Sequence, residues 1–305
     1  MLSSRRPSPD WTSVDIAVPR PRDRLPGVSM AGFLAHGPPP AGFDRAIAMV
    51  AHPFVTLLID LSEGGAQGDG RDDGRAGGLF HEAGGRRGYG SIAVGLLPRD
   101  VRTGGSTGEC LQIRLRPAVA TAVLGASVDL SGAVVPLADL WGRDAVRAEE
   151  RLRAADSWDD RFAIAAALIG RRLAVRRVDP EVAFAWRRAF GLRGQVRVDG
   201  LADEIGWSRK RLSARFHAQL GISPKRAARL IRFDHAAHLL AAGRPAADTA
   251  TASGYVDQPH LHRDVREFTG LTPTALAAAP WLSIDDVAWP DSAPGRRAVA
   301  RPSGE

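Results

Sequence analysis

The sequence predicts an α+β protein of two domains, in which an antiparallel β-barrel or β-sandwich with accompanying helices precedes an all-α C-terminal domain. Its length of 305 residues suits about two domains that each bury a core. Short apolar runs separated by Gly and Pro dominate the first half of the chain. A pattern typical of two short helices joined by a turn occurs twice near its end. Hydrophobic residues make up 44% and charged residues 25% of the chain, which is typical of a globular protein.

The N-terminal strands are predicted from apolar runs of strand length, at residues 28–34, 46–49, 54–61, 89–97 and 110–115. In the last run, alternation places Cys110, Gln112 and Arg114 on the face opposite to the apolar residues between them. We therefore expect a β-rich domain over residues 26–135, preceded by a flexible arm at 1–25. The glycine-rich stretch 64–90 lacks a Gly-Lys-Ser/Thr phosphate loop, which favours a flexible insertion or a long hairpin loop.

Few side chains in this half have the spacing of a chemical site. Cys110 is the single cysteine, which excludes a disulfide framework and a multi-cysteine zinc site, and its place in a strand predicts an inert packed thiol. His52 and His81 have no ligand partner at a recognised spacing such as His-x-His, which favours surface or core histidines. We therefore predict no catalytic residue, no metal and no cofactor.

After Pro117 the apolar spacing becomes helical, over residues 118–124, 137–141, 144–155 and 159–173. Residues 136–177 are predicted as a helical linker that either mediates dimerisation or simply packs on the β-rich domain, and both interpretations stay open. A further helix opens at Asp179-Pro180, with Pro in its first turn, and ends at Gly191. It begins a C-terminal domain over residues 178–280, and residues 281–305 are expected to be disordered.

The C-terminal domain carries a short helical pattern that is first seen between residues 198 and 221. A first helix, with Asp199 as its predicted N-cap, ends at Gly206, and Ser208 caps a second helix that ends at Gly221. The second helix has an apolar face and a polar outer face. A helix, a tight turn with glycine and a second helix of this kind describe a helix-turn-helix.

A second copy follows, and the two copies share their turns and their core. Trp207 matches Tyr255 at an offset of 48, and core packing is favoured over stacking on nucleic acid for both. The core residues match at an offset of 49, and they are Leu212 and Phe216 in one copy and Leu261 and Val265 in the other. The predicted turn-forming glycines are Gly206, Gly221, Gly254 and Gly270. One continuous helix over residues 224–242 is predicted to join the two units.

Basic side chains accumulate on the first unit. The chain has 41 basic and 34 acidic residues, a net charge of +7, but between Ser208 and Arg232 eight residues are basic and none is acidic. Such a stretch is the electrostatic signature of phosphate binding. The candidates for phosphate contact, or otherwise for a solvated basic face, are Arg209, Arg211, Arg215, Lys225, Arg226 and Arg229.

Outward residues early in each second helix are candidate base readers, because the N-terminal part of a recognition helix enters the major groove. Arg and Lys donate to guanine, Gln pairs with adenine, and a small apolar side chain contacts the thymine methyl group. The candidates are Lys210, Ser213, Ala214, Gln258, His260, His262 and Arg263.

These patterns resemble the AraC/XylS family of bacterial transcription regulators over residues 180–280. The second unit carries the family's more recognisable signature, as Gly254-Tyr255, Asp257-Gln258, Leu261, Arg263, Gly270 and Thr272-Pro273. Val265 departs from it, because the family usually has Phe there. The resemblance implies two helix-turn-helix units joined by a linker helix, with base contacts at the seven candidates. The N-terminal half is more distantly similar to the cupin-like β-barrel sensor regions of family members.

The preferred interpretation is a sequence-specific DNA-binding transcription regulator without enzymatic activity, whose two recognition helices enter successive major-groove segments. Its expected partners are promoter or operator double-stranded DNA, a small-molecule effector, RNA polymerase and a second copy in a homodimer. The sequence has no long apolar run and no signal segment, which predicts a cytoplasmic protein that does not enter a membrane.

Two other interpretations use different features of the chain. One is an enzyme in the N-terminal half with DNA binding as an accessory function. A metal-dependent cupin enzyme would need two or three His and a carboxylate on neighbouring strands, which His52 and His81 do not supply. Some family relatives carry out DNA-repair alkyl transfer, which needs a cysteine cluster, and this sequence has one cysteine. A non-specific architectural binder would need an intercalating wedge, and the sequence shows no such pattern.

Overall fold

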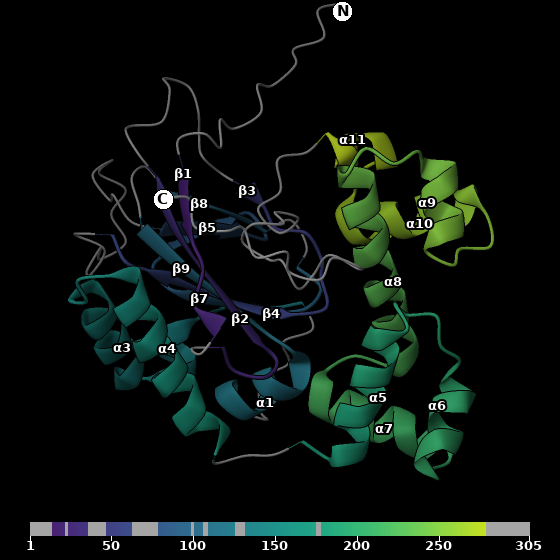
Figure 1. Ribbon diagram of the computed structural model, residues 1–305, viewed down its shortest axis with the longest axis horizontal. Helices are drawn as coiled ribbons and strands as arrows, with labels where there is room; N and C mark the ends of the chain where they lie inside the picture. Colours follow the sequence, from purple (N-terminus) through teal and green to yellow (C-terminus); the bar gives the residue numbers. More distant parts are fainter. Residues whose placement is uncertain are drawn as a thin grey trace, which may run out of the picture.

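The computed structural model describes residues 14–21, 24–35, 47–62, 79–98, 101–105, 109–125, 132–174 and 178–278. Two parts of the chain lie side by side, with the strands and helices α1 to α4 in one and helices α5 to α11 in the other (Figure 1). The predicted tail 281–305 and the first half of the glycine-rich stretch lie outside the described residues.

The larger sheet of the described residues is antiparallel and has the strand order β1-β2-β9-β4-β7-β10. Its strands are Val14–Ala17 (β1), Val28–Ala35 (β2), Glu109–Leu115 (β9), Val55–Asp60 (β4), Ile92–Val94 (β7) and Val134–Pro136 (β10). The runs at 28–34, 54–61 and 110–115 are confirmed as central strands. The flexible arm predicted for residues 1–25 is wrong at β1, which pairs along β2 and so forms the edge of this sheet.

The smaller sheet has the order β3-β8-β5-β6, from Ile47–Ala48 (β3), Arg102–Gly105 (β8), Leu79–Ala83 (β5) and Arg86–Tyr89 (β6). β5 and β6 form a hairpin across Gly84 and Gly85, which both have positive φ, as a tight hairpin turn requires. The described end of the glycine-rich stretch is therefore a hairpin. The run predicted at 89–97 is only partly a strand, because β6 ends at Tyr89 and β7 covers three residues.

The two sheets stack, and the faces of the larger sheet are covered differently. On one face, Leu58, Ile92 and Val94 form a small core with Leu79 of β5 and with Met49, which directly follows β3. The other face, with Leu57, Leu111 and Ile113, belongs to a core that continues into the helices. These layers are the predicted antiparallel sandwich with helices, and β4 is buried along its whole length.

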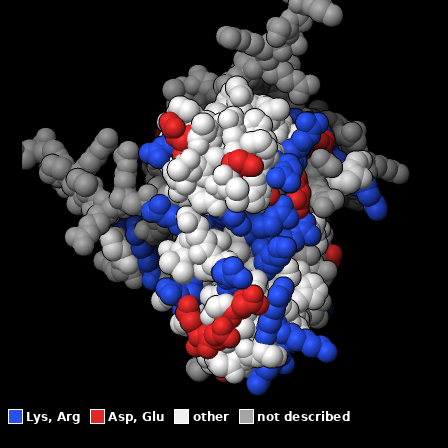
Figure 2. Space-filling model, turned by 90° about the vertical axis from the view of Figure 1, so that its right-hand side faces the viewer, with Lys and Arg blue, Asp and Glu red and all other residues white. Residues whose placement is uncertain are grey.

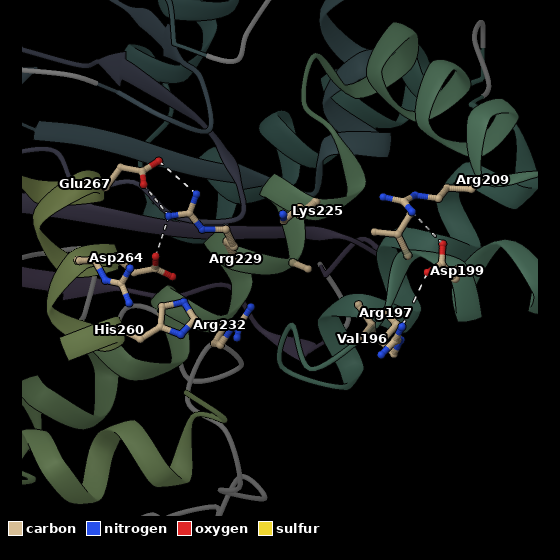
Figure 3. Close-up of a pocket in the computed structure, with 13 residues that line it drawn as sticks. Val196, Arg197, Asp199, Arg209, Lys225, Arg229, Arg232, His260, Asp264 and Glu267 are labelled. Carbon is tan, nitrogen blue, oxygen red and sulfur yellow. Dashed lines mark hydrogen bonds and ion pairs between the residues drawn. The ribbon is translucent and has the colours of Figure 1, made fainter. Parts of the chain in front are cut away.

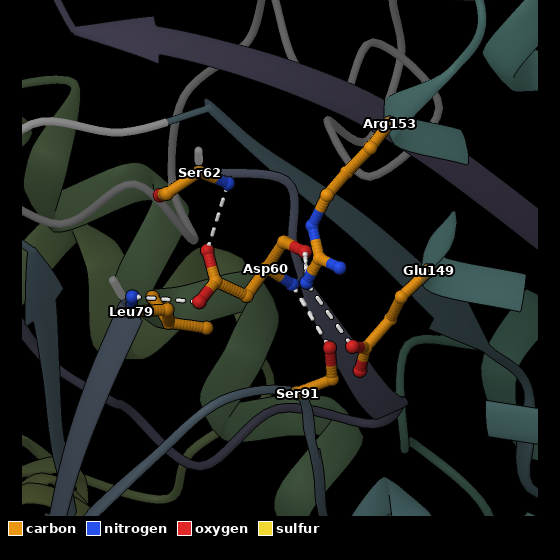
Figure 4. A network of polar contacts seen from close by, with 6 residues as sticks. All are labelled: Asp60, Ser62, Leu79, Ser91, Glu149 and Arg153. Atoms are coloured by element: carbon orange, nitrogen blue, oxygen red, sulfur yellow. Dashed lines mark hydrogen bonds and ion pairs between the residues drawn. The ribbon is translucent and has the colours of Figure 1, made fainter. Parts of the chain in front are cut away.

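A buried carboxylate joins the strands where the chain leaves β4 and returns as β5 (Figure 4). The carboxylate of Asp60 accepts hydrogen bonds from the main-chain nitrogens of Ser62, at 3.0 Å, and Leu79, at 3.1 Å. Its main-chain nitrogen donates to Ser91, and its carbonyl oxygen accepts from Arg153 at 3.0 Å. Asp60 therefore holds together the start of β5, the loop before β7 and the helical layer.

The helical layer consists of Pro117–Leu124 (α1), Leu137–Trp141 (α2), Arg143–Arg153 (α3) and Trp158–Leu173 (α4), as the apolar spacing predicts. Ser157 caps α4 by accepting a hydrogen bond from the main-chain nitrogen of Asp160. The ring of Trp158 lies directly on Gly32 of β2, where any Cβ would collide with it. Packing of this layer on the β-rich domain, one of the two open interpretations, is therefore seen.

The C-terminal helices are Pro180–Gly191 (α5), Val198–Ile205 (α6), Arg209–Leu220 (α7), Pro224–Ala241 (α8), Ala246–Ala252 (α9), Gln258–Thr269 (α10) and Pro273–Ala277 (α11). The predicted duplication is confirmed, with α6 and α7 in one unit, α9 and α10 in the other, and α8 between them. The predicted N-cap of α6 is wrong: Arg197 occupies that position, and Asp199 lies in the first turn. None of the helices in the described ranges combines the length and apolar composition needed to cross a membrane.

The β-rich part and the C-terminal helices share one hydrophobic core. α1 packs against α5 and α7, and the ring of Phe54 meets the ring of Phe190 edge-on at 5.7 Å between centroids. Arg114 of β9 is 1% exposed, because its face of the strand is covered; burial lowers its pKa to about 9, and Asp234 of α8 opposes that shift. The charges of Arg114 and Asp234 therefore interact across the boundary between the sheet and the helix that joins the two units.

Candidate nucleic-acid interface

The two helix-turn-helix units are built by the same local devices. Gly206 and Gly254 have φ values of 72° and 71°, in the left-handed region that lets the first helix stop and the chain reverse. Ser208 caps α7 by accepting from the main-chain nitrogen of Arg211 at 3.2 Å, and Asp257 caps α10 through that of His260 at 2.7 Å. Gly221 and Gly270 end α7 and α10, also with positive φ, so all four predicted turn glycines are confirmed.

The apolar faces of α7 and α10 hold each unit together. Leu212, Phe216, Leu261 and Val265 are fully buried, as predicted. Tyr255 is buried as well, so stacking of its ring on nucleic acid is excluded in this conformation. Trp207 is half-buried, and the guanidinium of Arg211 lies 4.3 Å from the centre of its ring. The aromatic residues after the turns therefore pack, as the sequence favours.

A cleft of about 820 Å³ opens between the two units (Figure 3). The N-terminal ends of α6 and α7 form one wall, with Arg197 and Arg209, and α10 forms the other, with His260 and Arg263. The floor is the first half of α8, which contributes Lys225, Ala228, Arg229 and Arg232. Figure 2 shows that Lys and Arg side chains gather along the middle of the face presented by the C-terminal helices, between acidic patches.

Arg229, one of the predicted phosphate contacts, is paired with two carboxylates instead. Its guanidinium lies 2.7 Å from Asp264 and 2.5 Å from Glu267, both on α10, and Asp264 is only 2% exposed. Burial lowers the pKa of Arg229, but the hydrogen bonds and charges of these two carboxylates outweigh it and raise the pKa. Arg229 therefore neutralises a buried acid and fastens α8 to α10, and its charge is not available to a phosphate.

Two further cations of the basic stretch are paired. Arg215 lies 2.6 Å from Asp179, ahead of α5, so this carboxylate competes with a phosphate for its guanidinium. Arg209 and Asp199 are 3.4 Å apart, but both side chains are more than half exposed, so this pair competes weakly with a phosphate. Arg226 is half-buried. The acid-free appearance of residues 208–232 therefore overstates the free charge, because the neutralising carboxylates come from other segments.

The remaining cations leave a smaller basic surface. Within the described residues, no ion pair engages Lys210, Lys225 or Arg263, and all three are exposed. Arg211 is exposed beside Trp207. Arg232 also lines the cleft, although the sequence predicts no individual role for it within the basic stretch. It lies three residues after Arg229 on α8, and this helical spacing is the sequence signal that puts the two side chains on one face of the helix.

The candidate base readers lie on α7 and α10, which are the second helices of the two units. Lys210 and Ala214 on α7, and Gln258, His262 and Arg263 on α10, are exposed, whereas Ser213 and His260 are half-buried. Gln258 and His262 are one turn apart, with 3.3 Å between Nε2 atoms. Only His260 and Arg263 line the cleft, and the other candidates lie on the outer surfaces of α7 and α10.

The other predicted candidates lie away from this surface. His52 is buried in the segment before β4, with its Nε2 atom 3.1 Å from the Thr56 hydroxyl, and His81 lies on β5 in the other sheet. Burial raises the pKa of Cys110 to about 12, with the nearby Asp60 charge adding to the shift, which is the behaviour of a packed thiol. No group of three or more His, Cys, Asp and Glu side chains in the described part of the chain could hold a metal ion.

Residues 201–279 match the sequence profile of a helix-turn-helix domain family. They form a helix-turn-helix domain of the AraC type. The AraC-type domain spans the two units from α6 to α11, and it supports the predicted DNA-binding transcription regulator. No curated protein was found to match the chain.

Similar solved structures include the C-terminal domain of AraT, a response regulator from Geobacillus stearothermophilus, at 24% identity. That match covers 34% of this chain and 88% of AraT's, with a TM-score of 0.32. ToxT from Vibrio cholerae O395 is 7% identical over 83% of this chain and 98% of its own, with a TM-score of 0.46. The xylose-binding transcription activator xylR is 18% identical over 39% of this chain and 38% of its own, with a TM-score of 0.30.

Proposed function

We propose that this chain binds operator DNA through α7 and α10, which enter two successive major-groove segments on one face of the duplex. The observation that carries this proposal is the pair of helix-turn-helix units on either side of one continuous helix, α8. α8 has 18 residues, so it is about 27 Å long. That length suits recognition helices held about 34 Å apart, which is one turn of DNA.

The cations that have no ion pair, or only a weak one, supply the phosphate contacts. Lys225 and Arg232, on the floor of the cleft, and Arg209 and Arg211, at the start of α7, are placed to meet the backbone between the two grooves. Such contacts position the protein without reading sequence. The base readers are Lys210, Ser213 and Ala214 on α7 and Gln258, His260, His262 and Arg263 on α10.

The N-terminal part regulates this surface through the interface it shares with the C-terminal helices. α1 contacts α7, the first recognition helix, and the charge of Asp234 on α8 acts on the buried guanidinium of Arg114 on β9. A shift of the sheet therefore moves one recognition helix and the spacer together, which alters their spacing on DNA. A small molecule bound by residues 26–135 would act in this way, and residues 136–177 are the region for contact with a second copy. RNA polymerase remains a predicted partner.

Selection from a pool of random duplexes tests the proposal. The full chain should enrich a motif of two base-specific blocks about one helical turn apart. Lys210→Ala should relax one block and Arg263→Ala the other, because each removes donors from a different helix. Recovery of duplexes with no common sequence, or of a single block that both substitutions relax, would refute binding through two recognition helices.

A further inference from the structure

We infer that Val256 is a specificity-determining residue of the second unit, whose side chain contacts the 5-methyl group of a thymine in the major groove. The inference rests on the proposed function, because it assumes that α10 enters a major groove. It adds an apolar reader to a surface whose other candidates act mainly through hydrogen bonds.

The two units differ by one residue in the segment between the aromatic residue and the helix cap. Trp207 corresponds to Tyr255 at an offset of 48, but the caps that follow, Ser208 and Asp257, correspond at an offset of 49. One residue has therefore been added between the aromatic residue and the helix cap in the second unit, and that residue is Val256. The first unit has no counterpart to it.

Val256 does not pack where an apolar residue at its position normally packs. The residue before an N-cap often lies against the fourth helical residue, here Leu261, and so fixes the entry of the chain into the helix. In this structure Leu261 is fully buried and Val256 is 89% exposed, so the contact is not made. Tyr255 fills the core position instead, and the added residue is pushed out into solvent.

The exposure of Val256 stands out within the described residues. The other large hydrophobic side chains that reach the surface are between 37% and 50% exposed, including Val146 on α3 at 50%. A valine side chain that gains nothing from the fold gains free energy when a ligand covers it. It stands directly before Asp257, whose carboxylate is committed to the cap, and two residues before the exposed candidate reader Gln258.

The major groove of DNA presents one feature that suits an apolar side chain, the methyl group of thymine. The N-terminal end of a recognition helix is the part that reaches base edges, and thymine alone presents a methyl group in the major groove. An aliphatic side chain without donors or acceptors can read that methyl group and no other feature of a base edge. Val256 therefore favours thymine at the position next to the one read by Gln258.

Deletion of single methyl groups from the DNA tests the inference with the full chain. Each thymine of a duplex obtained by selection is replaced in turn by deoxyuridine, which lacks only the 5-methyl group. The affinity of the unsubstituted protein should fall on the order of fourfold at one thymine in the α10 block, the effect of one methyl group that is no longer buried. Val256→Ala should bind the unmodified duplex about fourfold more weakly and should be insensitive to deoxyuridine at that position.

The control is Val18→Ala, the same substitution at an exposed valine directly after β1, outside the C-terminal helices and outside residues 136–177; it should retain the full response to deoxyuridine. Sequence-specific binding in which no single methyl deletion matters overturns the inference and leaves the proposed function intact. An equal loss for Val256→Ala on every duplex, with or without the methyl group, also overturns it, because it indicates a contact with the sugar or with another protein. Failure to select any sequence refutes the proposed function instead.

Discussion

The side-chain hydroxyl of Thr121 on α1 donates a 2.7 Å hydrogen bond to the main-chain carbonyl oxygen of Gln219 in the last turn of α7. The side-chain oxygen of the same Gln219 accepts a 2.9 Å hydrogen bond from the main-chain nitrogen of Asp179, where the chain enters α5. The carboxyl end of the first recognition helix is thus tied to the β-rich part and to the connection between the two parts. Its amino end, with Lys210, is left free at the surface.

Thr121→Val tests this tie, because it removes the donor and keeps the shape of the side chain. We expect a loss of about 1 kcal/mol in the free energy of unfolding and faster hydrogen exchange in the last turn of α7. Thr251→Val is the control, since the Thr251 hydroxyl bonds only within α9, to Ala247. Unchanged exchange in α7 would show that the hydrogen bond does not hold the helix.

Arg229 and Lys225 should respond in opposite ways to the loss of their charges. Arg229→Met leaves Asp264 buried without its partner, so the free energy of unfolding should fall by about 2 kcal/mol. Asp264→Asn in the same chain should recover part of that loss. Lys225→Met should leave stability unchanged and make the slope of log affinity against log salt about one unit less steep. A shallower salt slope for folded Arg229→Met would restore the phosphate role to that residue.

Arg263 should contribute more to base discrimination than to salt-dependent affinity. Arg263→Ala is expected to cost about 1–3 kcal/mol on the preferred duplex and to relax the preference at one base pair. Arg187→Ala, which removes an exposed arginine from α5, serves as the matched change of charge. Unchanged preference between duplex variants would count against a base contact by Arg263.

Acid should destabilise the fold through its buried histidines. Burial and the nearby Arg193 guanidinium lower the pKa of His235 to about 4, and burial and Arg114 hold the pKa of His52 well below 6.5. Between pH 6.5 and 4 the unfolded chain therefore binds protons that the folded chain does not. The free energy of unfolding should fall with falling pH there, by about 1.4 kcal/mol per pH unit for each histidine.

His235→Gln should flatten that pH profile, whatever it does to stability at neutral pH. An equally steep profile in His235→Gln would mean that other groups carry the acid dependence.

The C-terminal domain was largely predictable from the sequence, because its determinants are local. Gly206, Ser208 and the apolar spacing of α7 each act within about one or two turns of helix, and the duplication repeats the signal. The same local reading missed β1, since a short strand in a Pro- and Arg-rich segment is stabilised by its pairing with β2.

The charge of the site was less predictable, for a physical reason. The carboxylates that neutralise Arg229 lie 35 and 38 residues further along the chain, so no local pattern reveals them. Burial of Arg114 likewise depends on parts of the chain outside β9, which alternation within the strand does not report. The exposure of Val256 follows from a single added residue, whose effect appears only when the packing of both units is compared.

Base-resolved chemical footprinting of the full chain on a selected duplex tests the central claim most directly. Two protected major-groove segments should appear on one face, centred about 10 base pairs apart, and Lys210→Ala and Arg263→Ala should each weaken a different one. A single protected segment, or protection that does not depend on sequence, would contradict the account.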